Sequence, residues 1–257
     1  MIEWPPEVEV AVPSYQRAEL FRDRTMAVLA RLEVPPEKVR VFVADDDERN
    51  RYERALKSAH LAEIVVGEVG LDRARACIRS FYDRGQLVLS MDDDVKRIVR
   101  RIDEKKVVDL TGEEFATLAA VGFKLAAQKG LRLWGIYPVA NPYFMRAGWT
   151  TDLRFIGGGL FGAVNDLDER VVPRNVVKDD VERTLLYYTT DGGVVRCNEV
   201  SMVVDYYTAP GGIGDARSGG AEKFAALELE RRFPGLAKAW TRKNGRAEVR
   251  LRDRGLK

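Results

Sequence analysis

The 257-residue sequence is poor in the residues that several kinds of site require. It contains one histidine and two cysteines, Cys77 and Cys197. These cysteines are too few for a disulfide framework and form no metal-type pair, which fits a reducing cytoplasm. We find no secretory leader and no long apolar run, so we expect a soluble protein without a membrane partner.

An excess of charge of either sign is also missing. Lysine and arginine total 42 against 40 acidic residues, a net charge of +2, so the chain is not basic in the way that many nucleic-acid binders are. Any anionic partner must therefore bind a local patch. The most basic stretch is the C-terminal tail, with Lys238, Arg242, Lys243, Arg246, Arg250, Arg252, Arg254 and Lys257.

The first hundred residues alternate between two kinds of pattern. Apolar runs predict strands at 8–13, 39–44, 63–66 and 86–91, and amphipathic stretches predict helices at 18–32, 48–58 and 71–82. This alternation predicts a single α/β domain with a mostly parallel sheet flanked by helices. Ligands bind beyond the carboxyl ends of such strands, where Ser14, Asp45 and Asp92 are expected to lie.

Three consecutive acids, Asp92, Asp93 and Asp94, follow the apolar strand at 86–91. Like charges about 4 Å apart repel by roughly 4 kcal/mol at an effective dielectric near 20, and a divalent cation offsets that cost. Mg²⁺ or Mn²⁺ is typically held by one or two carboxylates together with phosphates and water, so the cluster predicts a phosphorylated co-substrate. The alternative is a solvated acidic turn in which Asp94 caps a helix at 95–99.

The second half is less regular. A helix is expected at 112–129, with Thr111 as its cap and Glu114 three residues on, followed by a strand at 133–138. The glycines at 157–159 would let the backbone approach a ligand or turn sharply. A loose stretch at 208–220 is the candidate for a mobile lid, before a helix at 221–232. No linker divides the chain.

The order of these motifs resembles that of nucleotide-sugar glycosyltransferases of the GT-A class. The matching features are the opening at 10–17, the acids Asp45 and Asp46, the helix start at 70–75 and the acids at 92–94. The resemblance implies a GT-A-like (Rossmann-like) fold, a UDP-sugar donor, and Mn²⁺ or Mg²⁺ held by Asp92 and Asp94. Many GT-A enzymes add a late histidine as a metal ligand. Here the one histidine, His60, comes early, so phosphates, water or Asp205 would complete the site.

More narrowly, the chain resembles the TET/JBP-associated glycosyltransferases of bacteriophages over nearly its whole length. The motifs are Val-Pro-Ser-Tyr-x-Arg, Gly-Leu-x-x-Ala-Arg, Leu-Ser-Met-Asp-Asp-Asp-Val, the glycine run at 157–162, and Pro-Gly-Gly at 210–212 with Arg217. That family is thought to add sugars to hydroxymethylated pyrimidines of phage DNA. The resemblance therefore implies DNA containing 5-hydroxymethylcytosine or a related base as partner, in the cytoplasm of a host cell.

The resemblance also divides the chain into a nucleotide-binding half, 1–101, and an acceptor-binding half, 102–257, that ends in the basic tail. Residues expected to bind the donor are Pro13, Ser14, Tyr15, Arg17, Asp45, Asp46, Arg73, Arg75, Asp93, Gly158 and Gly159. Several of these residues have a structural alternative. Asp45 and Asp46 can be helix caps, Arg73 and Arg75 can lie on a solvated helix face, and the glycines can belong to an ordinary loop.

A second acidic pair follows the glycine run, where inverting GT-A enzymes usually carry their catalytic base. Asp180 is the first choice for that base and Asp179 the second. A carboxylate within hydrogen-bond reach of the acceptor hydroxyl typically raises the reaction rate by about 10²–10⁴-fold. The alternative is that both acids cap a helix at 181–188, and a retaining reaction requires no base here.

For a DNA acceptor, phosphate contacts and stacking surfaces are offered by Arg146, Trp149, Arg154, Arg217 and the tail. Tyr143 and Phe144 are more typical of a core, and tail cations of a solvated face. Other readings stay open. The acceptor can be a protein, glycan or small molecule; the acids can serve a nucleotidyltransferase or nuclease; or the chain can be a DNA-binding accessory domain on an inactive GT-A scaffold.

Overall fold

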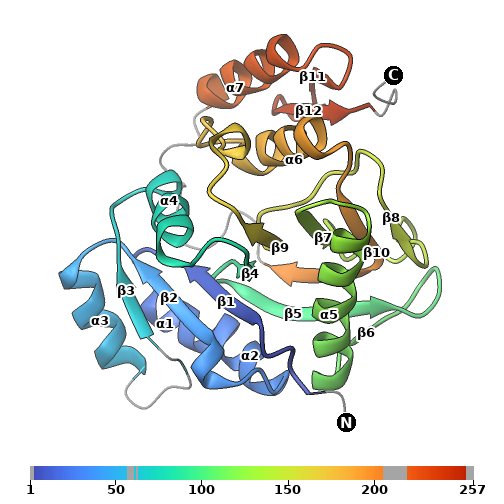
Figure 1. Cartoon of the computed structure of the whole chain (residues 1–257). Coiled ribbons are helices and arrows are strands. Elements are labelled where there is room, and N and C mark those ends of the chain that lie inside the picture. Colours follow the sequence, from blue (N-terminus) through green and yellow to red (C-terminus); the bar gives the residue numbers. More distant parts are fainter. Residues whose placement is uncertain (1–2, 57–60, 62, 205–218, 253–257) are drawn as a thin grey trace.

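Four parallel strands form one side of the central sheet in this computed structural model, which describes residues 3–56, 61, 63–204 and 219–252 (Figure 1). They are β1 (Val8–Pro13), β2 (Val39–Val43), β3 (Glu63–Val66) and β4 (Gln86–Met91), in the spatial order β3-β2-β1-β4. The predicted strands are confirmed, with β2 one residue shorter than expected.

The sheet continues beyond β4 with strands from the second half of the chain. Their order is β9 (Leu160–Asn165), β7 (Leu133–Tyr137), β10 (Val195–Val204), β5 (Val95–Arg101) and β6 (Val107–Asp109), with β8 (Trp149–Thr150) paired to β10. Strands β7 and β10 run parallel to each other, whereas β9 is antiparallel to both β4 and β7. The carboxyl ends of β4 and β7 therefore meet at the same edge.

Helices cover both faces of the sheet. One face carries the continuous helical segment α1 (Ala18–Phe21), η1 (Arg22–Met26) and α2 (Ala27–Arg31), together with α3 (Asp46–Leu56) and α5 (Gly112–Gln128). The other carries α4 (Leu71–Phe81) and α6 (Asp179–Asp191). Val10 and Val12 pack into the first core and Ala11 into the second, as alternation along a strand requires.

The remaining elements are short or peripheral. Helix α7 (Gly219–Arg232) packs on a hairpin of β11 (Ala237–Thr241) and β12 (Ala247–Leu251), above α6 in Figure 1. Two 3₁₀ turns are η2 (Pro36–Lys38) and η3 (Glu169–Val171). The described residues form a single domain, and none of their helices is long and apolar enough to span a membrane.

The predicted start of α5 is confirmed in atomic detail. The Thr111 hydroxyl accepts a hydrogen bond from the Glu114 amide at 3.2 Å, and the Glu114 carboxylate accepts one from the Thr111 amide at 2.9 Å. This is a capping box. The two partners satisfy helix-end amides that would otherwise lack acceptors.

The alternative helix at 95–99 is wrong, because these residues belong to β5. Val95, Ile98 and Val99 are buried, and the strand pairs with β10 about a hundred residues further along the chain. A sheet partner so distant in sequence overrides the local pattern. Asp94 consequently precedes a strand and caps no helix.

Several predicted features lie outside the described residues. These are His60, Asp205, Arg217 and all but the last two residues of the lid expected at 208–220.

Candidate active site

The loop after β1 is fixed by helix α3. The amide of Gln16, which adopts a left-handed φ of 57°, donates to the Glu48 carboxylate at 2.7 Å. The next amide, that of Arg17, donates to the Tyr52 hydroxyl at 3.3 Å. The predicted donor-binding residues Pro13, Ser14, Tyr15 and Arg17 are therefore held at the carboxyl edge of the sheet.

A chain of hydrogen bonds runs from this loop to the middle acid, Asp93. The Ser14 hydroxyl donates to Asp93 Oδ2 at 2.5 Å and lies 2.5 Å from the Tyr52 hydroxyl, which is therefore its donor. The Arg17 guanidinium lies 3.0 Å from Asp93 Oδ1 and 3.4 Å from Asp94 Oδ2. Burial raises the pKa of Asp93, and Arg17 and Ser14 oppose that rise. Asp93 thus uses both carboxylate oxygens to anchor the acidic turn to the β1 loop.

The charges of the outer acids, Asp92 and Asp94, repel each other. Burial raises the pKa of Asp92, and the charges of Asp94 and Asp179 raise it further, while Arg75 and Arg183 lower it. A cation near Asp92 and Asp94 would relieve this repulsion, so the donor set fits Mg²⁺ or Mn²⁺.

The acids alone do not complete a metal site. Among the described residues, no group of three or more histidine, cysteine or acidic side chains is arranged to hold a metal. Asp92 and Asp94 would therefore share a cation with oxygens supplied by a ligand, as is usual when Mg²⁺ binds together with substrate phosphates.

The glycine run brings the outer acid, an arginine and the second acidic pair together. The Asp92 amide donates to the Gly159 carbonyl at 3.0 Å. A Cβ added at Gly159 would lie 3.5 Å from Asp92 Oδ2, and one added at Gly158 would lie 3.3 Å from Arg75 Nη2 and 3.9 Å from Asp180 Cβ. Glycine allows this close approach: a Cβ at Gly159 would overlap the Met202 side chain, and one at Gly158 would crowd Arg75.

Arg75 and Arg183 form a cationic pair beside the acids. Arg75 Nε lies 2.8 Å and Arg183 Nη1 3.5 Å from Asp179 Oδ2. Both guanidiniums also approach the Phe161 ring, at 5.3 Å and 3.7 Å from its centroid. Burial, together with the charge of Arg75, lowers the pKa of Arg183 to about 10. Arg73 is different, because its side chain is 61% exposed and pairs with Glu68, as expected for a solvated helix face.

Asp180 has the properties of a proton acceptor. Burial and, second, the neighbouring Asp179 charge raise the pKa of its carboxyl to about 6. Oδ1 accepts a hydrogen bond from the Val181 amide at 2.8 Å. Both acids lie inside the first turn of α6, and the N-cap residue before them is Lys178. Neither acid is therefore the N-cap, and a carboxylate with this pKa is suited to general-base chemistry near neutral pH.

The acids after β2 contribute to helix α3. Asp45 Oδ1 accepts a hydrogen bond from the Glu48 amide at 2.8 Å, so the capping role is confirmed for Asp45. Asp46 opens α3 with its side chain 83% exposed and lies 3.6 Å from Arg49. A contact of either acid with a nucleoside stays a prediction.

The loop between β7 and β8 presents an exposed aromatic pair. Tyr143 and Phe144 are 60% and 58% exposed, so the expectation that they belong to the core is wrong. Their rings pack edge to face with centroids 5.0 Å apart. The exposed Arg146 braces the loop by donating to the Tyr143 carbonyl at 2.7 Å. This loop leaves the sheet at the edge where Asp92 lies.

The other candidates for DNA contact are paired or partly buried. Arg154 lies 2.7 Å from Asp152, and Trp149 is half-buried in β8. The described part of the tail forms the β11–β12 hairpin, and acids pair with some of its cations. The pairs are Lys238 with Glu230, Arg242 with Glu248, and Arg246 with Glu222.

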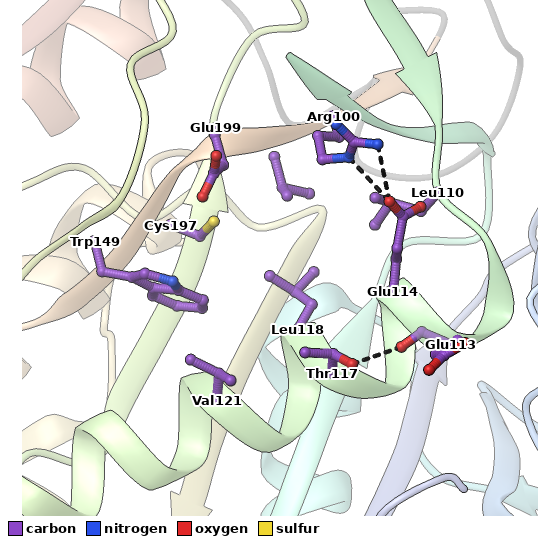
Figure 2. A pocket seen from close by; sticks show the side chains of 11 residues that line it. Arg100, Leu110, Glu113, Glu114, Thr117, Leu118, Val121, Trp149, Cys197 and Glu199 are labelled. Carbon is purple, nitrogen blue, oxygen red and sulfur yellow. Dashed lines mark hydrogen bonds and ion pairs between the residues drawn. The ribbon is translucent and has the colours of Figure 1, made fainter. Parts of the chain in front are cut away.

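Two cavities open among the helices and strands of the described residues. One of about 360 Å³ opens between α5 and β10, with Leu118, Val121 and Trp149 in its wall and the Arg100–Glu114 ion pair at its rim (Figure 2). None of the acids of the site lines it. A smaller one of about 170 Å³ is lined by Arg75 and Asp179 among others, and so adjoins the site.

Sequence reasoning missed three residues that contact the site. Tyr52 supports Ser14, Arg183 pairs with Asp179, and Thr25 contacts the acidic turn. Two of them carried a signal in the sequence. Arg183 follows Asp179 at the i,i+4 spacing of a helical ion pair, and Thr25 follows the apolar Phe21 at the spacing of a buried helix face.

Comparison with known proteins identifies the fold. No protein-family profile and no curated protein sequence matches the chain. A crystal structure of a mycobacterial protein superposes with a TM-score of 0.54 at 12% identity, over 96% of this chain and 83% of that one. Glucosyl-3-phosphoglycerate synthase from Mycobacterium tuberculosis, in complex with Mn²⁺ and UDP-glucose, superposes with a TM-score of 0.55 at 11% identity, over 95% of this chain and 86% of that one.

The same synthase in complex with Mn²⁺, UDP and phosphoglyceric acid gives a TM-score of 0.50 at 11% identity, over 96% of this chain and 86% of that one. At such identities the likeness concerns the fold alone. The predicted fold class is confirmed: the chain has the GT-A fold of nucleotide-sugar glycosyltransferases.

Proposed function

We propose that the protein is a metal-dependent glycosyltransferase that moves a sugar from a UDP-sugar to the hydroxyl of 5-hydroxymethylcytosine, or of another hydroxymethylpyrimidine, in DNA. The observation that carries the proposal is the convergence of Asp92, Gly158, Arg75 and Asp180, from separate parts of the chain, on one space at the carboxyl edge of the sheet. The Mn²⁺ and UDP-glucose bound by the synthase with the same fold support the donor half of the proposal.

The roles follow from the chemistry of these groups. The acceptor oxygen attacks the anomeric carbon, the bond from that carbon to the diphosphate breaks, and Asp180 takes the acceptor's proton. Arg75 donates forked hydrogen bonds to diphosphate oxygens. The backbone at Gly158 and Gly159 lies close to Arg75 and Asp92 and forms the floor under the sugar. When bound, Mn²⁺ or Mg²⁺ would neutralise charge on the leaving diphosphate.

The two halves of the chain divide the work in this proposal. Residues 1–101 bind the nucleotide, with the β1 loop and Asp45 next to the nucleoside, and residues 102–257 bind the acceptor. The loop is held by α3 before any donor arrives. Such preorganisation lowers the entropy that binding costs.

The exposed aromatic pair supports a nucleic-acid acceptor. Bases stack on aromatic rings, and an enzyme that modifies a base within a duplex must flip that base into its site. Tyr143 and Phe144 offer such a surface, next to the cationic Arg146. A small anionic acceptor is the second candidate, because the synthase with this fold is also found with phosphoglyceric acid and two arginines lie at this site.

The test is mass spectrometry of nucleosides from DNA incubated with the protein, Mn²⁺ and a panel of UDP-sugars. We expect a gain of one hexose or N-acetylhexosamine, confined to DNA that contains hydroxymethylcytosine and abolished by EDTA. Release of UDP in Mn²⁺ without DNA modification would contradict the acceptor and retain the transferase. DNA binding with no metal-dependent UDP release would instead indicate an inactive scaffold.

Surface variants refine the acceptor test. Replacing both Tyr143 and Phe144 with alanine should weaken DNA binding and base modification while UDP-sugar binding is unchanged. Phe224→Ala is the control, because Phe224 is 72% exposed on α7, outside this loop. Equal DNA modification by both variants would exclude the aromatic pair as the stacking surface.

A further inference from the structure

One hydroxyl group closes the turn that carries the three acids. Thr25 Oγ1 donates a hydrogen bond to the Asp92 carbonyl at 2.7 Å and accepts one from the Val95 amide at 3.0 Å. These two backbone groups flank the residues Asp93 and Asp94. The Thr25 side chain therefore spans the whole acidic turn between β4 and β5 from the helix packed beneath it.

Thr25 reaches this position from an unusual helical turn. The segment Arg22–Met26 is a π-helical turn between α1 and α2, and Thr25 within it is 0% exposed. Its neighbours Arg22 and Asp23 are exposed and pair with each other. π-Helical turns inside α-helices are frequent at functional sites. Here the turn contains the side chain that meets the acidic turn.

The turn is thus held at separate points. Asp93 is fixed by Ser14 and Arg17 from the β1 loop, and the backbone on either side of it by Thr25. Asp92 and Asp94 flank the anchored Asp93, so their direction depends on these contacts. Groups that orient metal ligands from behind commonly determine how well the metal is held.

We propose that Thr25 is a positioning residue for the divalent-cation site of Asp92 and Asp94, through the two hydrogen bonds of its hydroxyl. The inference rests on the proposed function, which assigns a cation to these acids. Thr25 itself does not contact the cation, the donor or the acceptor. A purely structural role is the competing account, and it predicts a loss of thermal stability without a change in the affinity of the folded protein for metal.

The test is a Mn²⁺ titration of the full chain in the presence of UDP, followed by electron paramagnetic resonance, at a temperature where each variant is folded. Thr25→Val keeps the shape of the side chain and removes both hydrogen bonds. We expect it to weaken Mn²⁺ binding by about 10- to 100-fold, the usual effect of losing a group that orients metal ligands. Thr25→Ser retains the hydroxyl and should bind Mn²⁺ like the unaltered chain.

Two further variants, Thr25→Ala and Thr117→Val, separate loss of the hydrogen bonds from other effects of substitution. Thr25→Ala removes the same bonds without placing a methyl group against the Asp92 carbonyl, and should weaken Mn²⁺ binding like Thr25→Val even if the valine variant does not fold. Thr117→Val is the control, because within the described part of the chain its hydroxyl donates to the Glu113 carbonyl of α5 and not to the acidic turn. Folded Thr25→Val or Thr25→Ala protein with unchanged Mn²⁺ affinity would overturn the inference. Absence of Mn²⁺ binding by the unaltered chain would overturn the proposed function instead.

Discussion

The guanidinium of Arg75 lies 2.8 Å from the carboxylate of Asp179. This ion pair joins α4, from the first half of the chain, to the first turn of α6, from the second. The two proposed halves therefore meet at the site itself. To contact a donor diphosphate, Arg75 must share its forked donors between Asp179 and the phosphate oxygens.

Loss of the Arg75 guanidinium should weaken donor binding. Arg75→Ala removes charge-assisted hydrogen bonds, which are worth about 1.5–3 kcal/mol each, so we expect at least a tenfold rise in the Kd for UDP measured by calorimetry. Arg73→Ala is the matched control on the same helix, because the Arg73 side chain is 61% exposed and its partners among the described residues are Glu68 and Asp72. Equal effects of the two substitutions would remove Arg75 from the donor site.

Asp180 is expected to act in the chemical step. Asp180→Asn keeps the shape of the side chain but cannot take a proton, so kcat should fall by about 10²–10⁴-fold while UDP-sugar binding is retained. Asp179→Asn should mainly affect donor binding, because Asp179 orients Arg75. The reverse pattern, a small effect at Asp180 and a large kcat effect at Asp179, would assign the base to Asp179.

The pH dependence of transfer should report the raised pKa of Asp180. Burial and the Asp179 charge raise this pKa from 3.8 to about 6. The base must be ionised, so kcat/KM should fall as the pH drops through about 6. The stability of the fold should change with pH in the opposite direction. A carboxyl whose pKa is higher in the folded state stabilises the fold fully below 3.8, and this contribution is lost as the pH rises through about 6.

Two measurements check this pair of signs. A pH–rate profile between about pH 5 and 8 should show the falling acid limb. Thermal unfolding over the same range should show that Asp180→Asn raises the stability of the ligand-free chain most at the higher pH, by on the order of 1–3 kcal/mol. An Asp180→Asn variant that is less stable at pH 7 than the unaltered chain would contradict the assigned shift.

Adjacent glycines offer a matched test of the space for the donor sugar. A Cβ at Gly158 would lie 3.3 Å from Arg75 and 3.9 Å from Asp180, whereas one at Gly157 would meet only Phe155, at 3.8 Å. Gly158→Ala should therefore lower the rate of transfer by tenfold or more, which corresponds to a rise of about 1.4 kcal/mol in the activation free energy. Its melting temperature should change little. Gly157→Ala should leave the rate nearly unchanged. Similar rates for both variants would place the sugar elsewhere.

The fold of the first half could be read from the sequence because its signals are local. The strands at 8–13, 63–66 and 86–91 have the predicted bounds, and the Thr111 capping box was visible as a four-residue pattern. Residues 95–99 were ambiguous, because two valines and an isoleucine around a Lys-Arg pair fit a short helix as well as a strand. The pairing with β10 that decides between them is remote in sequence.

Some residues of the candidate site could likewise be predicted from local sequence, and others could not. Asp92 and Asp180 could be named because acids after a strand or a glycine run are unusual, and the structure does bring their surroundings together. The inward direction of Asp93 depends on Ser14, Arg17 and Tyr52, which no local pattern connects. The exposure of Tyr143 is likewise a property of a loop conformation and not of residue type.

The most direct test of the account is UDP release from a panel of UDP-sugars, measured with Mn²⁺, with EDTA, and with the Asp94→Ala variant. Asp94 caps no helix, and Arg17, which lies 3.4 Å from it, keeps Asp93 as a partner at 3.0 Å, so the variant should stay folded. The account predicts UDP release in Mn²⁺ that EDTA abolishes and that the folded Asp94→Ala variant lacks. Full release by that variant, or release that EDTA does not affect, would contradict the assignment of a cation to these acids.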